Sequence, residues 1–235
     1  MSTTSDEKSA LKNSSVDILD AGRLRLCLYT LLFGGIWNTL TMLHPWGWPS
    51  ATMVTAIAMS VMIGYIIIKR DALGQQFMVF SLVAGFVELL ADWYLVAVDR
   101  SLFYNPNGPF IWMSPFYMPF CWAGNLFIFG VLGRWFDKKW GLMAAIVVTG
   151  LLGCIVLPYW EFIAKYAAFW DYRNTLMIGP VPYYIIFGEF FIVAGLPLAF
   201  RLVKRFNNWL ASIGMGIIFG LWLFVAYWLG IQIFS

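Results

Sequence analysis

Apolar stretches and short polar breaks alternate along the chain after residue 22. Each apolar stretch is long enough to cross the hydrocarbon core of a bilayer, about 30 Å thick, as an α-helix. The breaks carry prolines, glycines, asparagines and paired charges, which are typical of turns. We therefore predict an all-α integral membrane protein built as a seven-transmembrane-helix bundle. The predicted helices cover residues 25–43, 50–68, 73–98, 110–133, 140–163, 178–201 and 208–234.

The beginning of the chain has a different composition. Residues 1–22 are polar, rich in Ser, Asp and Lys, and lack the apolar run of a signal peptide. We predict a short, disordered, polar cytoplasmic tail over 1–22 and a single seven-helix membrane domain over 23–235. No stretch has the composition of a separate soluble domain.

Composition agrees with a membrane location. Hydrophobic residues make up 61% of the chain and charged residues 11%, against about 25% charged residues in soluble domains. We predict a multi-pass protein of a bacterial inner membrane or an equivalent membrane, without a nucleic-acid partner. The chain has one histidine, His44, whereas membrane iron enzymes and haem proteins need several. We expect no metal and no cofactor.

Basic residues predict the orientation of the bundle. With a cytoplasmic N-terminus, the cytoplasmic side holds twelve Lys and Arg residues and the other side three. Because cytoplasmic loops of membrane proteins are enriched in Lys and Arg, we predict the N-terminus inside and the C-terminus outside. The three outer basic residues are Arg100, Lys165 and Arg173.

Two carboxyl groups inside the third apolar stretch indicate a functional site. Glu88 and Asp92 are four residues apart, about one helical turn, so both side chains share a face. A carboxylate at the bilayer centre costs roughly 2.5 to 3.5 kcal/mol on insertion scales, so the pair needs a partner, a proton or a cavity. On the predicted topology, the membrane-region acids all fall in the outer half or outside it. These acids are Glu88, Asp92, Asp99, Glu161, Asp171 and Glu189.

These positions predict one polar cavity in the outer half of the bundle. We assign Glu88, Asp92 and Glu189 as candidate catalytic residues at its floor, with Asn38 and Asn125 as neutral neighbours in substrate binding. The two asparagines fit equally a role as bridges between helices. Asp99 and Glu161 fall near the interface, where a carboxylate costs little, so a structural or solvated role is the expectation for both.

Aromatic side chains complete the candidate substrate-binding set. Residues 169–173 form an aromatic, charged loop that is suited to cover the cavity mouth, and Asp171 lies within it. Aromatic faces stabilise cations, although much of the 19% aromatic content must serve as an interfacial belt. The candidates are Trp93, Tyr94, Tyr117, Trp122, Trp170, Tyr183 and Tyr184.

Paired carboxyl groups in an apolar cavity predict acid-base chemistry. Two negative charges are costly there, so the Glu88 and Asp92 pair should share a proton and offer a general acid beside a general base. Such a pair can protonate an alkene, an epoxide or a leaving group and then remove a proton elsewhere. A substrate that arrives from the bilayer would be an isoprenoid or a related lipid. We therefore predict a cyclase, an isomerase or a hydratase. Such an enzyme belongs to the isomerase or the lyase class.

A short segment resembles a known family. Trp170-Asp171-Tyr172 and the later Gly179-Pro180-Val181-Pro182-Tyr183-Tyr184-Ile185-Ile186-Phe187 are similar to the Trp-x-Tyr and Gly-x-x-Pro-x-Glu-Glu-x-x-Phe pattern of the membrane lycopene cyclase domain of carotenoid synthesis. Tyr183 and Tyr184 stand where that family has paired glutamates, so the resemblance implies a related helical scaffold more than the same reaction. Size, span number and scarcity of histidine are also similar to integral-membrane terpene cyclases.

Other classes of function remain open. Buried carboxyl groups also form proton relays, which would fit a proton-coupled carrier or a channel. They also fit a non-catalytic membrane subunit in which they hold helices together. Residues 208–234 contain no lysine, which excludes a retinal Schiff base there. Small residues in this segment, Gly214, Gly216 and Gly220, would allow a homo- or hetero-oligomer in the membrane.

Overall fold

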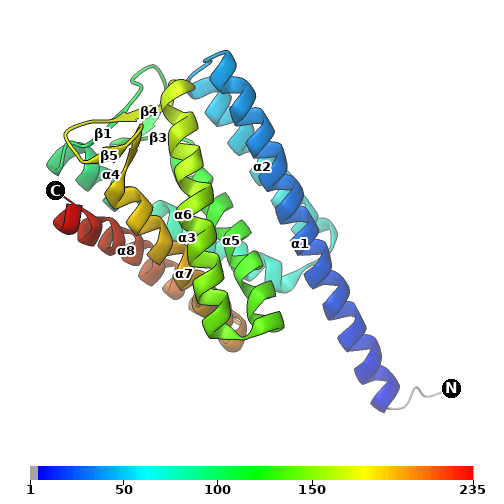
Figure 1. The fold of residues 1–235 in the computed structure, drawn as a ribbon. Coiled ribbons are helices and arrows are strands. Elements are labelled where there is room, and N and C mark those ends of the chain that lie inside the picture. Colours follow the sequence, from blue (N-terminus) through cyan, green and yellow to red (C-terminus); the bar gives the residue numbers. More distant parts are fainter. Residues whose placement is uncertain (1–4, 235) are drawn as a thin grey trace.

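Helices dominate the computed structural model, which describes residues 5–234 and, for side chains, residues 19–234 (Figure 1). Seven long helical segments follow one another in this part of the chain. The third is subdivided into two α-helical pieces and a π-helical end. The segments are α1 Ser5–Leu43, α2 Trp48–Ile68, α3 Ala72–Val87 with α4 Leu89–Trp93 and η1 Tyr94–Val98, α5 Met118–Trp140, α6 Leu142–Tyr166, α7 Tyr183–Phe206 and α8 Trp209–Phe234.

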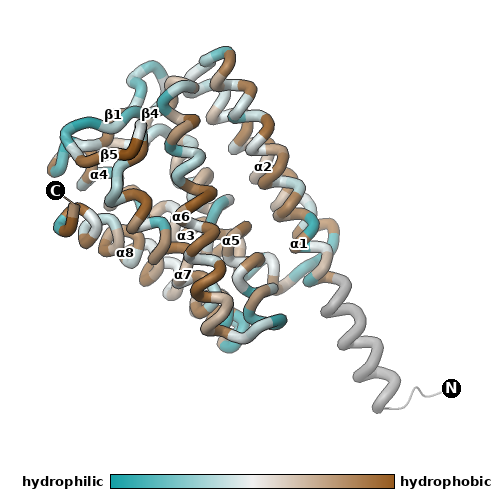
Figure 2. The backbone as a smooth tube through the Cα atoms, viewed as in Figure 1, coloured by the Kyte–Doolittle hydropathy of each residue, from teal (hydrophilic) through white to brown (hydrophobic). Residues whose placement is uncertain are grey.

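Six of these segments are long and apolar enough to cross a membrane, within the part of the chain that the structure describes. Figure 2 shows the apolar residues along the helices and the polar ones at their ends and in the connections. The expectation of an α-helical, multi-pass integral membrane protein is therefore confirmed. The six segments are Leu19–Leu43, Trp48–Ile68, Ala72–Val98, Leu142–Tyr166, Tyr183–Phe206 and Trp209–Phe234.

Helix α5 differs from the other six because it is buried within the bundle along most of its length. Its residues from Ala123 to Arg134 are buried almost without interruption. A helix surrounded by other helices needs no continuous lipid-facing apolar surface, so α5 tolerates Asn125 and several glycines.

Short strands cap one end of the bundle, which we call the hairpin end (Figure 1). β1 Leu102–Tyr104 pairs antiparallel with β4 Trp170–Tyr172, in a register that places Tyr104 opposite Trp170. Two hairpins are formed by β2 Phe110–Ile111 with β3 Ser114–Pro115 and by β5 Met177–Ile178 with β6 Val181–Pro182.

These hairpins correct two predicted helix starts. Residues 110–117 and 178–182 were assigned to helices by their apolar composition, but α5 begins at Met118 and α7 at Tyr183. Proline explains both differences. Pro115 and Pro182 end the strands because they lack an N–H, and Pro119 is accommodated in the first turn of α5, where its N–H would have no helical partner.

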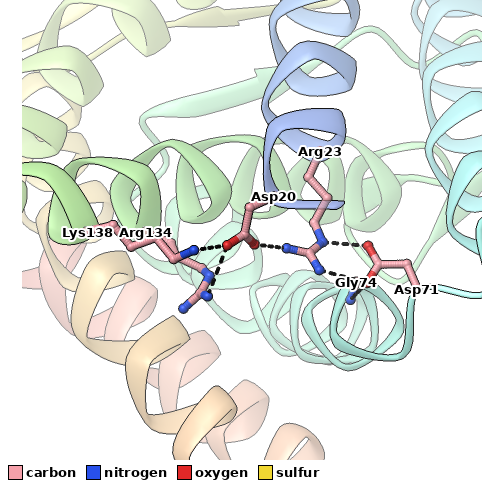
Figure 3. Close-up of polar contacts among 6 residues, drawn as sticks. All are labelled: Asp20, Arg23, Asp71, Gly74, Arg134 and Lys138. Atoms are coloured by element: carbon pink, nitrogen blue, oxygen red, sulfur yellow. Dashed lines mark hydrogen bonds and ion pairs between the residues drawn. The ribbon is translucent and has the colours of Figure 1, made fainter. Parts of the chain in front are cut away.

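The predicted disordered tail is also corrected. Helix α1 begins at Ser5, so most of residues 1–22 are helical, and residues 1–4 lie outside the described part. Asp20 lies in this segment and forms ion pairs with Arg23, Arg134 and Lys138 (Figure 3). These ion pairs connect the beginning of the first apolar span to α5.

Arg23 extends the same network to α3. Its Nε and Nη2 atoms donate to the two carboxylate oxygens of Asp71, at 2.5 Å and 2.8 Å (Figure 3). Asp71 also accepts from the backbone N–H of Gly74 at 3.0 Å and so caps the N-terminus of α3. Arg23 and Asp71 are 3% and 1% exposed, which makes this a buried, two-pronged ion pair.

Close packing of α3 on α5 fixes the depth of the carboxyl groups. A Cβ atom at Gly85 would lie 2.2 Å from the carbonyl oxygen of Pro119, so only glycine allows this approach. Farther from the hairpin end, Phe77 and Phe80 of α3 pack on Phe200 of α7, with ring centroids 4.1 Å and 5.4 Å apart. An aromatic layer therefore lies between Asp71 and Glu88 along α3.

We predict that Arg23→Ala lowers the free energy of unfolding by about 3 to 5 kcal/mol, because it leaves the buried Asp71 carboxylate unpaired. Thermal unfolding in detergent, followed by tryptophan fluorescence, measures the effect. Arg205→Ala, at an exposed position of the same end, is the control and should unfold at the wild-type temperature. Equal unfolding temperatures for the two variants would contradict a stabilising role of the buried pair.

Candidate functional site

The helical segment that carries Glu88 and Asp92 is irregular from Glu88 to its end near the hairpins. Helix α3 ends at Val87, and the N–H of Ala91 donates to the carbonyl of Glu88 at 2.7 Å, a bond of the 3₁₀ type. The π-helical turn η1 follows directly after Trp93. π-helical turns inside α-helices often occur at functional sites. Both carboxyl groups therefore lie where the backbone departs from a regular helix.

A cavity of about 140 Å³ lies beside these residues and brings four carboxyl groups together. The four acids that line it are Glu88 between α3 and α4, Asp92 of α4, Glu161 of α6 and Glu189 of α7. Glu88 and Glu189 are each 1% exposed and Asp92 is 3% exposed. The neighbouring pair of Glu88 and Asp92 therefore shares one space near the hairpin end with two acids that are distant in the sequence, Glu161 and Glu189.

Side chains from the β1 and β4 strands satisfy two of these acids. The Tyr104 hydroxyl donates to Asp92 Oδ2 at 2.6 Å. The Tyr172 hydroxyl and the Trp170 Nε1–H both donate to Glu161 Oε2, at 2.8 Å and 2.6 Å. The antiparallel pairing of β1 with β4 places all three donors over the helix ends.

Glu189 and Glu88 are satisfied less completely. The Tyr227 hydroxyl of α8 donates to Glu189 Oε1 at 2.7 Å, but the buried Oε2 atom has no hydrogen-bond partner among the described residues. The buried Oε2 atom of Glu88 likewise has none within that part of the chain. Since a buried polar atom without a partner costs about 1 to 3 kcal/mol, both oxygens are suited to meet a bound molecule.

Three more buried polar atoms in the cavity wall lack a partner within residues 19–234: Asn38 Oδ1, the Tyr117 hydroxyl and Trp160 Nε1. Buried polar atoms are normally satisfied, by protein or by ordered water. Their concentration around one cavity indicates a site for a ligand or water rather than a finished hydrophobic core.

The phenols of the capping strands keep their protons. Burial raises the pKa of Tyr104 well above its ordinary value, and the neighbouring Asp92 and Glu88 raise it further. Burial also raises the pKa of Tyr172 well above its ordinary value, helped by Glu161. Both hydroxyls are therefore donors toward carboxylate oxygens across the physiological pH range.

The structure brings most of the predicted site residues to this cavity. The three candidate catalytic acids line it, together with five of the candidate binding residues. Those five are Asn38, Tyr117, Trp122, Asn125 and Trp170.

The other five candidate binding residues lie outside the cavity wall, and a role for them in substrate binding stays a prediction. Asp171 forms an ion pair with Lys165 at 3.2 Å near the surface, and Tyr184 shares a hydrogen bond with Ser101 at 2.9 Å in the core. The remaining three pack on aromatic neighbours: Trp93 on Trp112, Tyr94 on Phe224 and Tyr183 on Phe234.

Four residues of the site were not anticipated as such: Tyr104, Glu161, Tyr172 and Tyr227. Glu161 was placed near the interface because it lies close to a helix end, but β4 folds over that end and encloses it. Tyr104 and Tyr227 belong to no motif of the sequence. No local pattern distinguishes them from belt or core tyrosines.

The acids of the cavity are not arranged as a metal site. Within the described residues, no group of three or more His, Cys, Asp or Glu side chains is positioned to hold a metal ion. The carboxyl groups are instead paired with phenol and indole donors, an arrangement suited to holding and moving protons.

We predict that the Tyr104→Phe variant loses less stability than the wild type as the pH rises above about 10, the ordinary pKa of tyrosine. In the wild type, an unfolded tyrosine releases its proton there whereas the folded one keeps it, so stability falls as the pH rises, by about 1.4 kcal/mol per pH unit for each such group. Chemical unfolding in detergent between pH 9 and 11 measures the slope, and Tyr29→Phe, at a position 69% exposed, is the control. A Tyr104→Phe slope equal to that of the wild type would refute the prediction.

Comparison with known proteins adds a family but no activity. No curated protein and no solved structure matches the chain. A family model described as a domain of unknown function, DUF6989, matches residues 89–234. The match runs from α4 to α8 and includes Asp92, Glu161 and Glu189 with their phenol partners, whereas α1, α2 and Glu88 precede it. Since it covers more than half of the sequence, the chain belongs to the family of the DUF6989 domain of unknown function.

Proposed function

We propose that the protein is a membrane-embedded acid-base enzyme of the cyclase, isomerase or hydratase type that acts on an isoprenoid or a related lipid. The observation that carries the proposal is the pair of unpartnered, buried carboxyl oxygens, Glu88 Oε2 and Glu189 Oε2, in the wall of one cavity. Such oxygens are placed to give a proton to, or take one from, a molecule that occupies the cavity.

The proposed reaction moves protons without a change of redox state. A protonated carboxyl group of the Glu88 and Asp92 pair adds its proton to an alkene carbon, which leaves a cation on the adjacent carbon. A carboxylate, with Glu189 as the candidate, removes a proton from a neighbouring carbon and forms the new double bond. Capture of the cation by an internal alkene before proton loss gives a ring, and capture by water gives a hydrated product.

Cavity size supports a substrate whose reacting part is small. An engineered protein cavity of about 150 Å³ lined by apolar side chains binds benzene, and this cavity is about 140 Å³. A ring or one branched five-carbon unit fits that space, whereas a whole long-chain lipid does not. The rest of a lipid substrate must therefore extend beyond the cavity.

Aromatic side chains in the wall support a cationic intermediate. Trp122, Trp160 and Trp170 all line the cavity. The faces of indole rings attract cations by about 0.5 to 2 kcal/mol, most where water is excluded. Acids beside aromatic faces fit the cyclase chemistry that the sequence resemblance implies, although the acids here lie at other positions than the paired glutamates of the lycopene cyclase domain.

The proton-coupled carrier is less well supported. A carrier needs a polar path on both sides of its site. The aromatic layer of Phe77, Phe80 and Phe200 lies between the cavity acids and the ion network around Asp71. Packed rings at that depth offer no groups that relay protons.

We also propose an orientation and a seventh span. Helix α5 crosses the bilayer inside the ring of the other helices, and the network of Asp20 and Arg23 marks the cytoplasmic end. Basic residues support this orientation, since only Arg100, Lys165 and Arg173 lie on the side of the hairpin end. The cavity then opens in the outer half of the membrane.

We predict that Glu88→Gln and Asp92→Asn lower turnover by at least about 10²-fold, because an amide neither gives nor takes a proton in this step. Mass spectrometry of lipids from expressing cells and from the purified proteins measures the product. Asp99→Asn is the matched control, because Asp99 lies on the same helical segment but does not line the cavity.

An isoprenoid isomer, ring or hydrated product that is present with the wild type and Asp99→Asn, and absent with the two site variants, is the expected result. Full activity of both site variants, folded as judged by unfolding temperature, would sink the proposal. Proton flux into liposomes at the wild-type rate without any lipid product would move the assignment to a carrier.

We predict that a reporter fused after Ser235 is active outside the cytoplasm. Alkaline phosphatase, which folds only outside, should be active at this position, and green fluorescent protein, which fluoresces inside, should be dark. A fusion of each reporter to the N-terminus gives the opposite pair if the orientation is right. The reverse pattern at the C-terminus would refute it.

A further inference from the structure

A second hollow lies on the outside of the bundle, between α1 and α6. It has a volume of about 600 Å³, roughly four times that of the carboxyl cavity. Its lining is almost entirely apolar and lies on the surface of the bundle: Leu28, Leu32, Ile36, Leu40 and Tyr159 are all at least 43% exposed. We call this hollow the α1–α6 groove.

The groove adjoins the carboxyl cavity and shares two lining side chains with it. Leu31 of α1 and Trp160 of α6 line both spaces. On α1 the consecutive glycines Gly34 and Gly35 line the cavity and the groove respectively. A Cβ atom at Gly35 would lie 3.6 Å from the Trp160 ring. The partition between groove and cavity is therefore formed by the Leu31 and Trp160 side chains and by the α1 backbone at Gly34 and Gly35.

The apolar span of α1, Leu19–Leu43, is attached to the bundle near both of its ends. At one end Arg23 pairs with Asp71. At the other, Trp37 Nε1 donates to the Ser50 hydroxyl at 2.9 Å, and Thr39 and Tyr159 share a hydrogen bond of 2.7 Å across the end of the groove. The groove runs along the stretch between these attachments, where apolar side chains line both helices.

We propose that the α1–α6 groove binds an extended prenyl or other isoprenoid chain from the bilayer and leads its reactive end between Leu31 and Trp160 to the carboxyl groups. This inference rests on the proposed function for the identity of the chain. Size supports it, because the cavity holds about one five-carbon unit and the groove supplies the length that the rest of a linear chain requires. Adjacency supports it, because the Leu31 and Trp160 side chains separate the groove from the cavity and line both.

The polar atom at the partition fits the same ligand. Trp160 Nε1 is buried and has no acceptor within residues 19–234. An oxygen atom on the chain, such as the hydroxyl of a prenol, would satisfy this donor as the chain enters. An unbranched hydrocarbon tail of a bulk phospholipid offers no such group at that position.

The test uses the full protein in lipid nanodiscs and a prenol that carries a diazirine in its chain. Photolysis followed by peptide mass spectrometry locates the label. We expect label on α1 and α6 around Leu31 and Trp160, competed by unlabelled prenol and not by unlabelled palmitate. Label spread over the lipid-facing helices without competition would overturn the proposal and mean that bulk lipid fills the groove.

Two glycine variants make a matched pair for the same experiment. Gly35→Phe places a ring in the groove, whereas Gly214→Phe adds the same ring on α8, where a Cβ atom has no neighbour within 4 Å. Gly35→Phe should lower both labelling and turnover by about tenfold or more, and Gly214→Phe should keep wild-type values. Equal values for the two variants would also overturn the proposal.

Glu88→Gln separates this inference from the enzyme proposal. It lacks turnover if the proposed function is right, and it keeps groove labelling because Glu88 lines only the cavity. Loss of turnover in Glu88→Gln with unchanged labelling and turnover in Gly35→Phe would refute the groove alone. Competed labelling with no lipid product from the wild type would refute the enzyme and leave a prenol-binding site.

Discussion

The cost of placing carboxyl groups away from water constrains the hairpin end of this bundle. Each buried acid needs a donor, and three of the four obtain one from a phenol: Asp92 from Tyr104, Glu161 from Tyr172 and Glu189 from Tyr227. Two of these donors come from strands that fold over the helix ends. The β1 and β4 pair is therefore part of the site as well as a cap.

Two buried clusters of charge lie at opposite ends of the protein and are satisfied to different degrees. Around Asp20 and Asp71, carboxylates meet guanidinium and ammonium groups, and the result is a structural attachment of α1. Around the cavity, the partners are neutral donors, and Glu88 keeps a free oxygen. Paired opposite charges stabilise a fold, whereas a buried carboxyl oxygen without a donor has capacity left for a ligand or a proton.

The central position of α5 allows the close packing that positions Glu88. Because neighbouring helices cover it, α5 can carry Asn125 and glycines at low cost, and Gly85 of α3 then packs directly against its first turn. This close contact holds Glu88 at a fixed depth beside the cavity. The aromatic layer of Phe77, Phe80 and Phe200 lies between the two polar regions along α3.

The sequence alone determined the helical membrane class, the approximate spans and the shared face of Glu88 and Asp92, because segment length and helical periodicity are local properties. It misassigned residues 110–117 and 178–182, since short apolar hairpins have the composition of helix ends. Only the tertiary structure decided that Glu161 belongs to the site and that phenols satisfy the acids. Those contacts join residues 11 to 38 positions apart through strand pairing and helix packing, and no local pattern encodes which tyrosine meets which carboxyl group.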